Sequence, residues 1–404
     1  MRVGIDATTW WNDRGFGRFT RDLVGALCAR NSGFEYTLVV DRRPDTSLPP
    51  NVQVISAAAG RTLTEAAVGA GARGLRDMWR IQEQVRRARF DVFFFPAVYS
   101  YFPLLSRTPC IVAFHDTIAE RYPAMVFPTT RNHLLWQAKT TLAKLQCRRA
   151  MTVSQASARD LHSVLGIAAE SIDVVMPAAD PVFRKIDDAA GVARIRARAQ
   201  VPEGAPLIVY VGGLNRHKNL LGLLRAWHLV ARARPDVHLV IVGDTSGTGF
   251  YDYAQELMLA VQTAPELRSR VHFPGQLSDP EVVQLLNGST GLILPSFLEG
   301  FGLPAVEAMQ VGVPVLASRI ECLTEVVADA GLYFDPHSPD EMAGAIVQLV
   351  DDTALHERLS AAARRRAPMF SWGRAAELAE QSFLRCARPR AAISSGGTTA
   401  ARAR

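Results

Sequence analysis

Short apolar runs that alternate with helical patterns are the feature that most limits how this chain can fold. In its first half, Val3–Asp6, Glu35–Val40 and Cys110–Phe114 are expected to be strands separated by helices. Strands separated in this way are typical of βαβ units, whose strands form a parallel sheet. The second half repeats the pattern from Leu207–Val211 to Ala343–Asp351. The sequence therefore predicts an α/β protein with two doubly wound sheets.

The length of 404 residues is enough for two domains. We place a first domain at 1–185, a polar and arginine-rich hinge at 186–203, and a second domain at 204–370. An amphipathic helix is expected over 371–388. The tail at 389–404 is rich in Ala, Gly, Ser, Thr and Arg, a composition typical of disorder.

Composition excludes several classes of protein. With 48% hydrophobic and 21% charged residues, the chain is ordinary for a globular protein. Its net charge of +6 favours anionic partners, but no nucleic-acid-binding module is present, so we expect no nucleic acid partner. The five cysteines are scattered, as in a reduced cytoplasmic chain, and no apolar run approaches the ~20 residues of a membrane span. We expect a cytoplasmic protein, at most peripheral at the inner face of a membrane.

Two glutamates flank a glycine-containing loop in the second half. Glu299 and Glu307 are separated by seven residues, and the apolar run Thr290–Pro295 precedes them. Because Pro304 suits the first turn of a helix, the loop is expected to join a strand end to a helix start. Backbone N–H groups are unpaired there and suit a polyhydroxylated ligand that carries a phosphate. The alternative is an ordinary turn with a solvated glutamate and a helical one.

A second motif places two cations after a strand. Leu207–Val211 leads into Gly212 and Gly213, and then into Arg216 and Lys218. Glycines let the backbone approach a ligand closely, and two cations at a helix start can clasp a diphosphate. The alternative is a solvated basic turn.

At these two motifs the chain resembles the retaining family-4 glycosyltransferases of the GT-B fold (glycosyl transferases group 1). The resemblance extends from about Arg2 to about Leu384. It implies two Rossmann-like domains facing across a cleft, the first binding the acceptor and the second the nucleotide diphosphate sugar. It also implies a last helix that crosses back to the first domain. The activity implied is hexosyl transfer with retention, with mannose as one candidate sugar and polysaccharide biosynthesis as one setting.

The resemblance implies roles for individual residues. Arg216 and Lys218 would neutralise the leaving diphosphate, and Glu299 would hold a sugar hydroxyl. His115, which ends a strand, would donate a hydrogen bond to the sugar. These four are the predicted catalytic residues. The predicted donor-binding residues are Gly15, Gly17, Gly213, Gly243, Gln276, Leu277, Gly300, Phe301, Gly302, Leu303 and, on the ribose, Glu307. The predicted acceptor-binding residues are Asp13, Arg14, Arg18 and Asp116.

No D-x-D triplet occurs in the chain. Metal-dependent glycosyltransferases often hold a divalent ion with two such carboxylates. Because Arg216 and Lys218 can neutralise the leaving group themselves, we expect no metal ion and no cofactor. The acceptor stays open between a saccharide, a lipid-linked saccharide and a small molecule. Two other classes stay open: a GT-B nucleotide-sugar epimerase or phosphorylase, and a non-catalytic nucleotide-sugar-binding partner.

The stretch Arg131–Arg149 combines basic and apolar residues in a helical pattern. It carries Arg131, Lys139 and Lys144 among several leucines. Basic amphipathic helices can lie on anionic membranes. The alternative is a domain helix whose apolar side packs into the core while its basic side is solvated. Contact with an anionic membrane surface therefore stays open.

Overall fold

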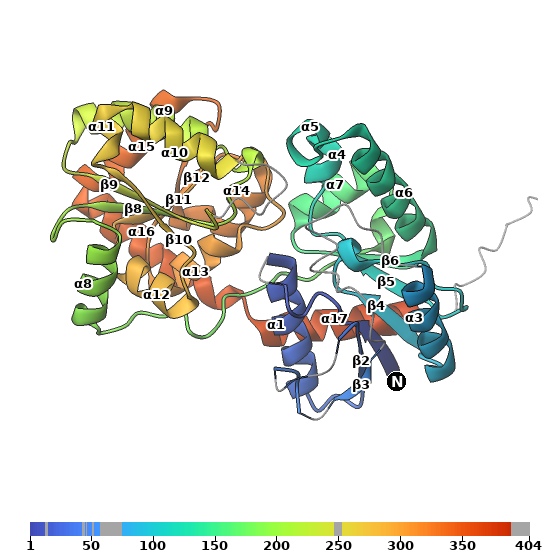
Figure 1. Cartoon of the computed structure of the whole chain (residues 1–404). Helices are drawn as coiled ribbons and strands as arrows, with labels where there is room; N and C mark the ends of the chain where they lie inside the picture. Colours follow the sequence, from blue (N-terminus) through green and yellow to red (C-terminus); the bar gives the residue numbers. More distant parts are fainter. Residues whose placement is uncertain are drawn as a thin grey trace, which may run out of the picture.

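Two α/β units lie side by side in the protein (Figure 1). The computed structural model describes residues 1–12, 15–42, 45, 47–50, 52–56, 75–245 and 253–388, with the backbone alone for 75–80. Asp13, Arg14 and the tail predicted at 389–404 lie outside the described residues.

The first unit is built on a parallel sheet in the order β3-β2-β1-β4-β5-β6-β7. Its strands are β1 (Arg2–Asp6), β2 (Glu35–Val40), β3 (Gln53–Ser56), β4 (Val92–Phe95), β5 (Cys110–Ala113), β6 (Cys147–Thr152) and β7 (Ile172–Val174). Its helices are α1 (Gly15–Ala29), α3 (Leu75–Ala88), η1 (Val98–Ser100), α4 (Ile118–Arg121), α5 (Pro123–Val126), α6 (Thr130–Gln146), α7 (Gln155–Leu165) and η2 (Ala169–Ser171).

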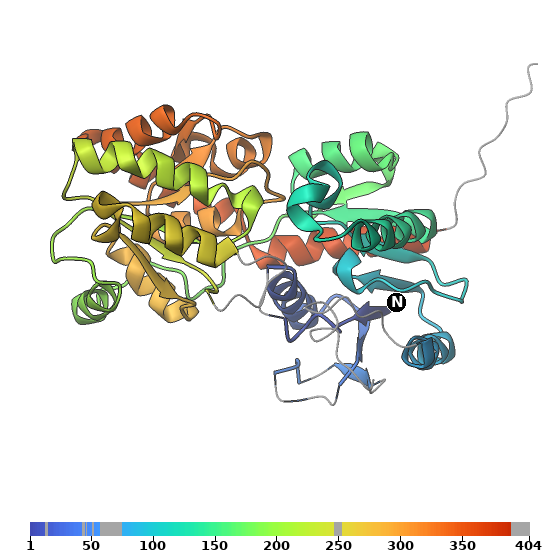
Figure 2. The ribbon, with the colours of Figure 1, turned by 45° about the horizontal axis from the view of Figure 1, so that its top comes forward.

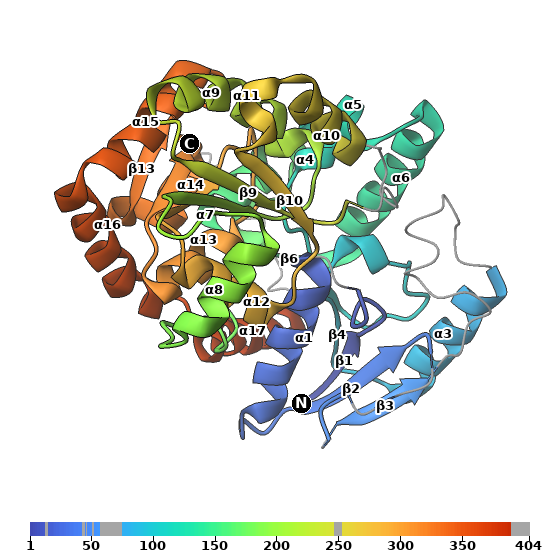
Figure 3. The same ribbon diagram turned by 60° about the vertical axis from the view of Figure 1, so that its left-hand side comes forward.

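The second unit is built on a parallel sheet in the order β10-β9-β8-β11-β12-β13, with helices on both of its faces (Figures 2 and 3). Its strands are β8 (Leu207–Val211), β9 (His238–Val242), β10 (Val271–Gly275), β11 (Gly291–Leu294), β12 (Val315–Ser318) and β13 (Gly331–Phe334). Its helices are α8 (Ala189–Arg198), η3 (Arg216–Lys218), α9 (Leu220–Ala233), α10 (Tyr253–Thr263), α11 (Pro265–Arg268), α12 (Asp279–Asn287), α13 (Leu303–Val311), α14 (Glu321–Val327), η4 (Ala328–Ala330), α15 (Pro339–Asp351), α16 (Thr353–Arg366) and η5 (Ala367–Met369).

The strand order of each sheet reverses near its middle. In the first sheet β1 lies between β2 and β4, and in the second β8 lies between β9 and β11. The connections on either side of such a point leave toward opposite faces of the sheet, so ligands bind beyond the carboxyl ends of its strands. The predicted fold of two doubly wound sheets is therefore confirmed, and each sheet has one switch point.

Helix α6 differs from its predicted range. The pattern predicted a helical stretch over Arg131–Arg149, whereas α6 starts at Thr130 and ends at Gln146. Cys147 already belongs to β6, where it pairs with Cys110 of β5. Backbone pairing with a neighbouring strand has overridden a local preference for helix at this end.

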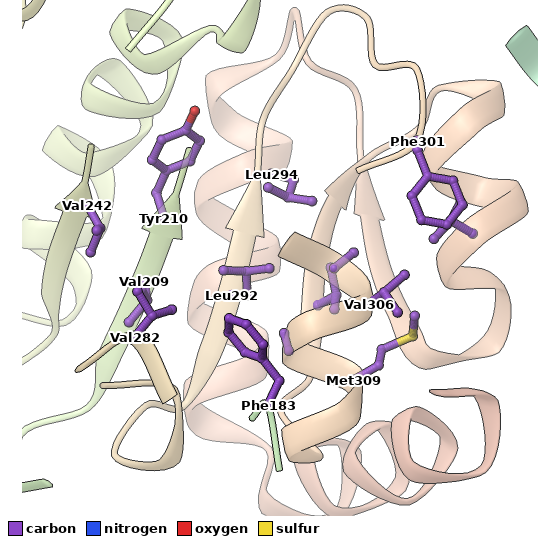
Figure 4. Packing of buried hydrophobic residues seen from close by; sticks show 14 of the residues in the cluster. Phe183, Val209, Tyr210, Val242, Val282, Leu292, Leu294, Phe301, Val306 and Met309 are labelled. Atoms are coloured by element: carbon purple, nitrogen blue, oxygen red, sulfur yellow. The ribbon is translucent and has the colours of Figure 1, made fainter. Parts of the chain in front are cut away.

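The hinge predicted at 186–203 is not a free linker. It contains α8, which packs against α12, and Arg196 of α8 donates a hydrogen bond to the carbonyl of Gly288 at 2.6 Å. Phe183 already lies in the core of the second unit, beside side chains of β11 and α13 (Figure 4). Arg196 and Arg198 of the predicted hinge therefore bind the second unit, the latter through Glu281, and the chain has entered that unit by Phe183.

The predicted crossover helix is confirmed as α17 (Trp372–Ala387), which packs against α1 and the first sheet (Figure 1). Two buried carboxylates fix it there. Asp173 of β7 accepts hydrogen bonds from Ser382 at 2.6 Å and from Arg385 at 2.7 Å. Glu380 of α17 accepts one from Tyr36 of β2 at 2.9 Å. The last helix of the chain is thus a structural part of the first unit.

We predict that Asp173→Ala lowers the free energy of unfolding by about 3–5 kcal/mol, because Arg149 would keep a largely buried charge without its partner. Urea titration followed by circular dichroism measures this change. The matched control is Glu377→Ala, which removes an exposed ion pair with Arg374 on α17 and should change stability by less than about 1 kcal/mol. Equal stability of the two variants would contradict this role of Asp173.

Candidate functional site

Glycines lie in a row at the carboxyl ends of three neighbouring strands of the second sheet. The N–H of Gly212 donates to Val242 at 3.1 Å, and that of Gly243 to Gly275 at 3.2 Å. A Cβ on Gly243 would lie 2.5 Å from the carbonyl oxygen of Gly212. Gly243 is thus required where the ends of β8 and β9 approach, and Gly213 follows as an exposed residue.

A buried ion pair joins the two predicted motifs. The Nζ atom of Lys218 lies 2.7 and 2.8 Å from the two carboxylate oxygens of Glu299, which is 8% exposed. The Ser296 hydroxyl donates to the same carboxylate at 2.6 Å. Burial opposes ionisation of Glu299, but Lys218 and Ser296 outweigh it and hold the pKa of this carboxyl below its usual value. An ammonium has three N–H donors, so Lys218 has a third to offer to an anion.

Arg216, on the same turn as Lys218, has a different environment. Its guanidinium lies 2.9 Å from a carboxylate oxygen of Glu256 of α10 and over the ring of Tyr253, 5.4 Å from its centroid. Both ends of this ion pair are exposed to solvent. Such pairs contribute about 0–1 kcal/mol, so Arg216 can exchange Glu256 for a phosphate at little cost.

Sequence reasoning missed Asn219, which holds these loops together. Its backbone adopts the left-handed conformation, with φ of 57°. Its side-chain amide donates to the carbonyls of Pro295 at 3.1 Å and Pro336 at 2.7 Å. The turn after β8 is thereby tied to the loops after β11 and β13. An asparagine just before a helix signals a cap, but its distant partners leave no trace in the sequence.

His115 follows β5 in the first unit, and its ring already makes one hydrogen bond within that unit. Its Nε2 atom lies 2.8 Å from the carbonyl oxygen of Pro96. Burial lowers the pKa of His115 to about 4, so the ring is neutral near pH 7. A carbonyl can accept only, so Nε2 carries the proton and Nδ1 is an acceptor. In this state Nδ1 can accept a hydrogen bond from a sugar hydroxyl. The donation predicted from sequence would need the proton on Nε2, which the carbonyl of Pro96 already accepts.

The two units meet where Gly300 reaches the first unit. The carbonyl oxygen of Gly300 accepts hydrogen bonds from the Ser154 hydroxyl at 2.8 Å and the Ser157 hydroxyl at 2.9 Å. A Cβ on Gly300 would lie 2.2 Å from the carbonyl oxygen of His115. Sequence reasoning missed both serines, because it had no means of placing the start of α7 against this loop.

Asp116 lies beside the same contact. Its carboxylate accepts a hydrogen bond from the N–H of Ile118 at 2.9 Å. Burial raises the pKa of Asp116. The charge of Lys218 lowers this pKa and that of Glu299 raises it. A Cβ on Gly300 would lie 3.2 Å from the Cβ atom of Asp116, so this predicted acceptor-binding residue lies beside the loop that carries Glu299.

A second ionic contact joins the units midway along α13, at Glu307. Arg18 of α1 lies 2.9 Å from a carboxylate oxygen of Glu307 and 3.5 Å from one of Asp279. Glu307 is 2% exposed, and burial raises its pKa to about 7 although Arg18 acts in the opposite direction. A predicted acceptor-binding residue thus contacts the predicted ribose-binding one.

The glycine loop of the first unit has a structural requirement of its own. A Cβ on Gly17 would lie 1.9 Å from the carbonyl oxygen of Asn12, so glycine is needed for the start of α1 to pack on the β1–α1 loop. Gly15 is exposed and would tolerate a side chain. Asp13 and Arg14 lie outside the described residues, so their predicted roles stay predictions.

The remaining predicted donor-binding residues present mostly backbone. Phe301 is buried and packs against Phe370, with ring centroids 5.7 Å apart, and Leu277 is also buried. Gly302 adopts φ of 85° directly before α13, and Leu303 begins that helix. Gln276 is the exposed side chain of this group. The start of α13 can therefore offer backbone N–H groups to an anion.

Comparison with known families gives two matches along the chain. Residues 14–183 match the family described as Glycosyltransferase Family 4, and residues 192–366 match Glycosyl transferases group 1. Among curated proteins, O-antigen chain mannosyltransferase B of Escherichia coli is 31% identical over 164 residues, which are 41% of this chain and 42% of the relative. D-inositol 3-phosphate glycosyltransferase of a Nocardioides species is 33% identical over 230 residues, or 53% and 48% of the two chains. The chain spans about half the length of these curated relatives.

Solved structures agree with the fold over nearly the whole chain. Sucrose-phosphate synthase of Thermosynechococcus elongatus superposes with a TM-score of 0.72 at 19% identity, covering 95% of this chain and 98% of its own. Anabaena HepE in complex with UDP and glucose gives a TM-score of 0.72 at 19% identity, covering 95% and 99%. At this identity the likeness shows the fold alone.

We predict that Gly300→Ala separates the two units, because its Cβ would collide with backbone and not with a side chain that could turn away. The overpacking should cost about 1–3 kcal/mol of stability. Small-angle X-ray scattering should show a larger radius of gyration, and urea titration a lower stability. The control is Gly344→Ala in α15, where the Cβ has open space and alanine favours helix. Unchanged scattering and stability for Gly300→Ala would contradict the contact.

Proposed function

The chain belongs to the family-4 glycosyltransferases with the GT-B fold (glycosyl transferases group 1), and on that premise we propose that it moves a hexose from a nucleotide diphosphate sugar to a hydroxyl acceptor. One observation carries the proposal. Glu299, paired with Lys218, precedes Gly300, and Gly300 packs against His115 and Asp116 of the first unit. Cationic, anionic and neutral polar groups thus converge beyond the carboxyl ends of both sheets, where α/β proteins bind ligands.

The diphosphate is the leaving group of the proposed reaction. Lys218 would place its third N–H on it, and Arg216 would leave its exposed pair with Glu256 for a phosphate oxygen. The backbone N–H groups at the start of α13 would add fixed donors. Preorganised donors of this kind stabilise charge that develops on a leaving group. We propose on this ground that no metal ion is needed.

The sugar would lie before the start of α13, at Glu299, and the ribose would lie beside the middle of that helix, at Glu307. Glu299, held ionised by Lys218, would accept a hydrogen bond from a sugar hydroxyl. His115 would accept another through Nδ1. Glu307 would accept from the ribose hydroxyls, because a carboxylate has roughly four lone-pair positions and Arg18 faces one of its oxygens.

The proposed transfer retains configuration. The bond between the anomeric carbon and the diphosphate oxygen breaks, and the acceptor oxygen bonds to the same face of that carbon. The acceptor proton passes to the departing phosphate oxygen, so no side chain has to form a bond to the sugar. The anomeric configuration of the product, read by NMR, tests this step: an inverted product would contradict it.

The donor is proposed by class, with GDP-mannose and UDP-hexoses as candidates. The names of the relatives support both, since one is a mannosyltransferase and HepE is seen with UDP and glucose. The acceptor is proposed as a saccharide, free or linked to a lipid, or a small hydroxylated molecule. A thermal-shift screen of nucleoside diphosphates and their sugars identifies the donor, because a ligand at a hundred times its Kd adds about 2.7 kcal/mol of stability.

We predict that Lys218→Ala lowers kcat/KM on the order of 10²–10³-fold, because a lost cation at the leaving group costs about 2.7–4 kcal/mol of barrier. Steady-state transfer with the donor found in the screen measures it. Lys185→Ala, at an exposed lysine, is the matched control and should keep wild-type kinetics. Near-normal kcat/KM in a folded Lys218→Ala protein would refute the assignment.

We predict that transfer survives chelation. EDTA should leave the rate within about twofold of its value in untreated protein, because Arg216, Lys218 and the α13 start neutralise the diphosphate. A complete loss of transfer that Mn²⁺ or Mg²⁺ restores would overturn metal independence.

A further inference from the structure

Helix α6 turns an apolar face toward solvent. Leu134, Leu135, Leu142 and Leu145 are 59%, 56%, 48% and 74% exposed. At 3.6 residues per turn the four side chains fall within an arc of about 100°. Thr140 and Ala143, on the other side of the helix, are buried. The leucines that sequence analysis could have assigned to the core therefore form an exposed stripe, which we call the leucine face.

Another exposed leucine follows a residue that is bonded to the end of α6. The amide of Gln146, at the end of the helix, exchanges hydrogen bonds with the backbone of Leu104 at 2.7 Å in both directions. The next residue, Leu105, is 75% exposed. Figures 1 and 3 show α6 on the outer flank of the first unit, away from the second unit. An exposed apolar patch of this kind on a globular protein marks an interaction surface.

The charged residues of α6 itself are all basic, while Glu120 accepts a hydrogen bond from Trp136 of this helix at 2.8 Å. The range Thr130–Gln146 contains no Asp or Glu, whereas Arg131, Lys139 and Lys144 lie on it. Arg131 is exposed, and the two lysines reach back to donate to the carbonyls of Tyr99 and Leu165 at 2.6 and 2.9 Å. The leucines are thus bordered by cations.

We propose that the leucine face docks on the surface of an anionic lipid bilayer. Leucines at the depth of the acyl-chain boundary with cations at the level of anionic headgroups are the arrangement of interfacial amphipathic helices. A second copy of this chain fits less well, because pairing two such helices would bring like charges together with no acid on either helix to offset them. Among the described residues, no helix has the length and apolar character that crossing a bilayer requires. The docked protein would therefore lie on the surface.

The opposite side of α6 leads toward the proposed site. The ring of Trp136 lies 5.1 Å from that of Tyr99, which stacks at 4.9 Å on Phe16 near the start of α1. Docking by the leucine face would hold this edge of the first unit near the bilayer, where an acceptor linked to a lipid would arrive. This last step rests on the proposed function, whereas membrane docking itself does not.

Co-sedimentation with vesicles, in the absence of any sugar, tests the docking. The wild-type protein should bind vesicles of phosphatidylcholine mixed with phosphatidylglycerol at least about tenfold more tightly than phosphatidylcholine alone, and added salt should weaken the binding. The variant with Leu134, Leu135, Leu142 and Leu145 all replaced by Gln should lose at least about tenfold in affinity. Its circular dichroism should match wild type, because the four side chains are exposed.

The matched control replaces two exposed leucines elsewhere, Leu259→Gln on α10 and Leu384→Gln on α17, and should bind vesicles like wild type. Equal binding by the four-leucine variant and wild type would overturn the proposal. So would a wild-type protein that ignores both kinds of vesicle. Sedimentation velocity without lipid tests whether the leucine face instead binds a second copy of this chain. A wild-type dimer that is lost in the four-leucine variant would assign the face to a second copy and overturn the proposal.

Discussion

The site depends on one close backbone contact, where Gly300 of the second unit lies against the first. Its carbonyl oxygen accepts hydrogen bonds from two serine hydroxyls at the start of α7. Because glycine has no side chain, the carbonyl of His115 can lie close to it. Glu325 of α14 reinforces the seam by accepting the N–H groups of Gln155 and Ala156, both at 2.8 Å. A carboxylate from one unit thus satisfies the unpaired donors of a helix in the other.

The contact between the two units leaves the start of α13, and not that of α7, available to an anion. The first N–H groups of α7 are taken by Ser154 and Glu325. The start of α13 has Gly302, which offers no side-chain cap. In the first turn of α13, Pro304 has no N–H and the N–H of Ala305 donates to the carbonyl of Gly302, which leaves the N–H of Leu303 as the donor that a phosphate can use.

Two carboxylates close together in the sequence acquire opposite character from their surroundings. Glu299 and Glu307 are both buried, yet the pKa of Glu299 lies below its usual value and that of Glu307 is raised to about 7. The difference is one of partners. Lys218 engages both oxygens of Glu299, whereas Arg18 faces one oxygen of Glu307 and Asp279 adds a like charge. Glu299 is thus a fixed anion, and Glu307 is a group whose charge depends on what lies beside it.

The sequence by itself determined the two doubly wound sheets and the places where polar residues follow their strands. These features are local: β8, β11, the turn at Arg216 and the Pro304 helix start are each encoded in about ten consecutive residues. The same locality explains where sequence reasoning failed. Composition marked 186–203 as a hinge, but the partners of α8 lie about 90 residues later in the chain, as the bond between Arg196 and Gly288 shows.

Only the tertiary structure decided how the site is assembled. Ser154 meets Gly300 across 146 positions of sequence, and Arg18 meets Glu307 from a different domain. The protonated nitrogen of His115 was fixed by the carbonyl of Pro96, which periodicity does not place. The exposure of the α6 leucines was likewise decided by the tertiary structure. A helical pattern shows that apolar residues share a face, but which face meets the core depends on what packs against the helix.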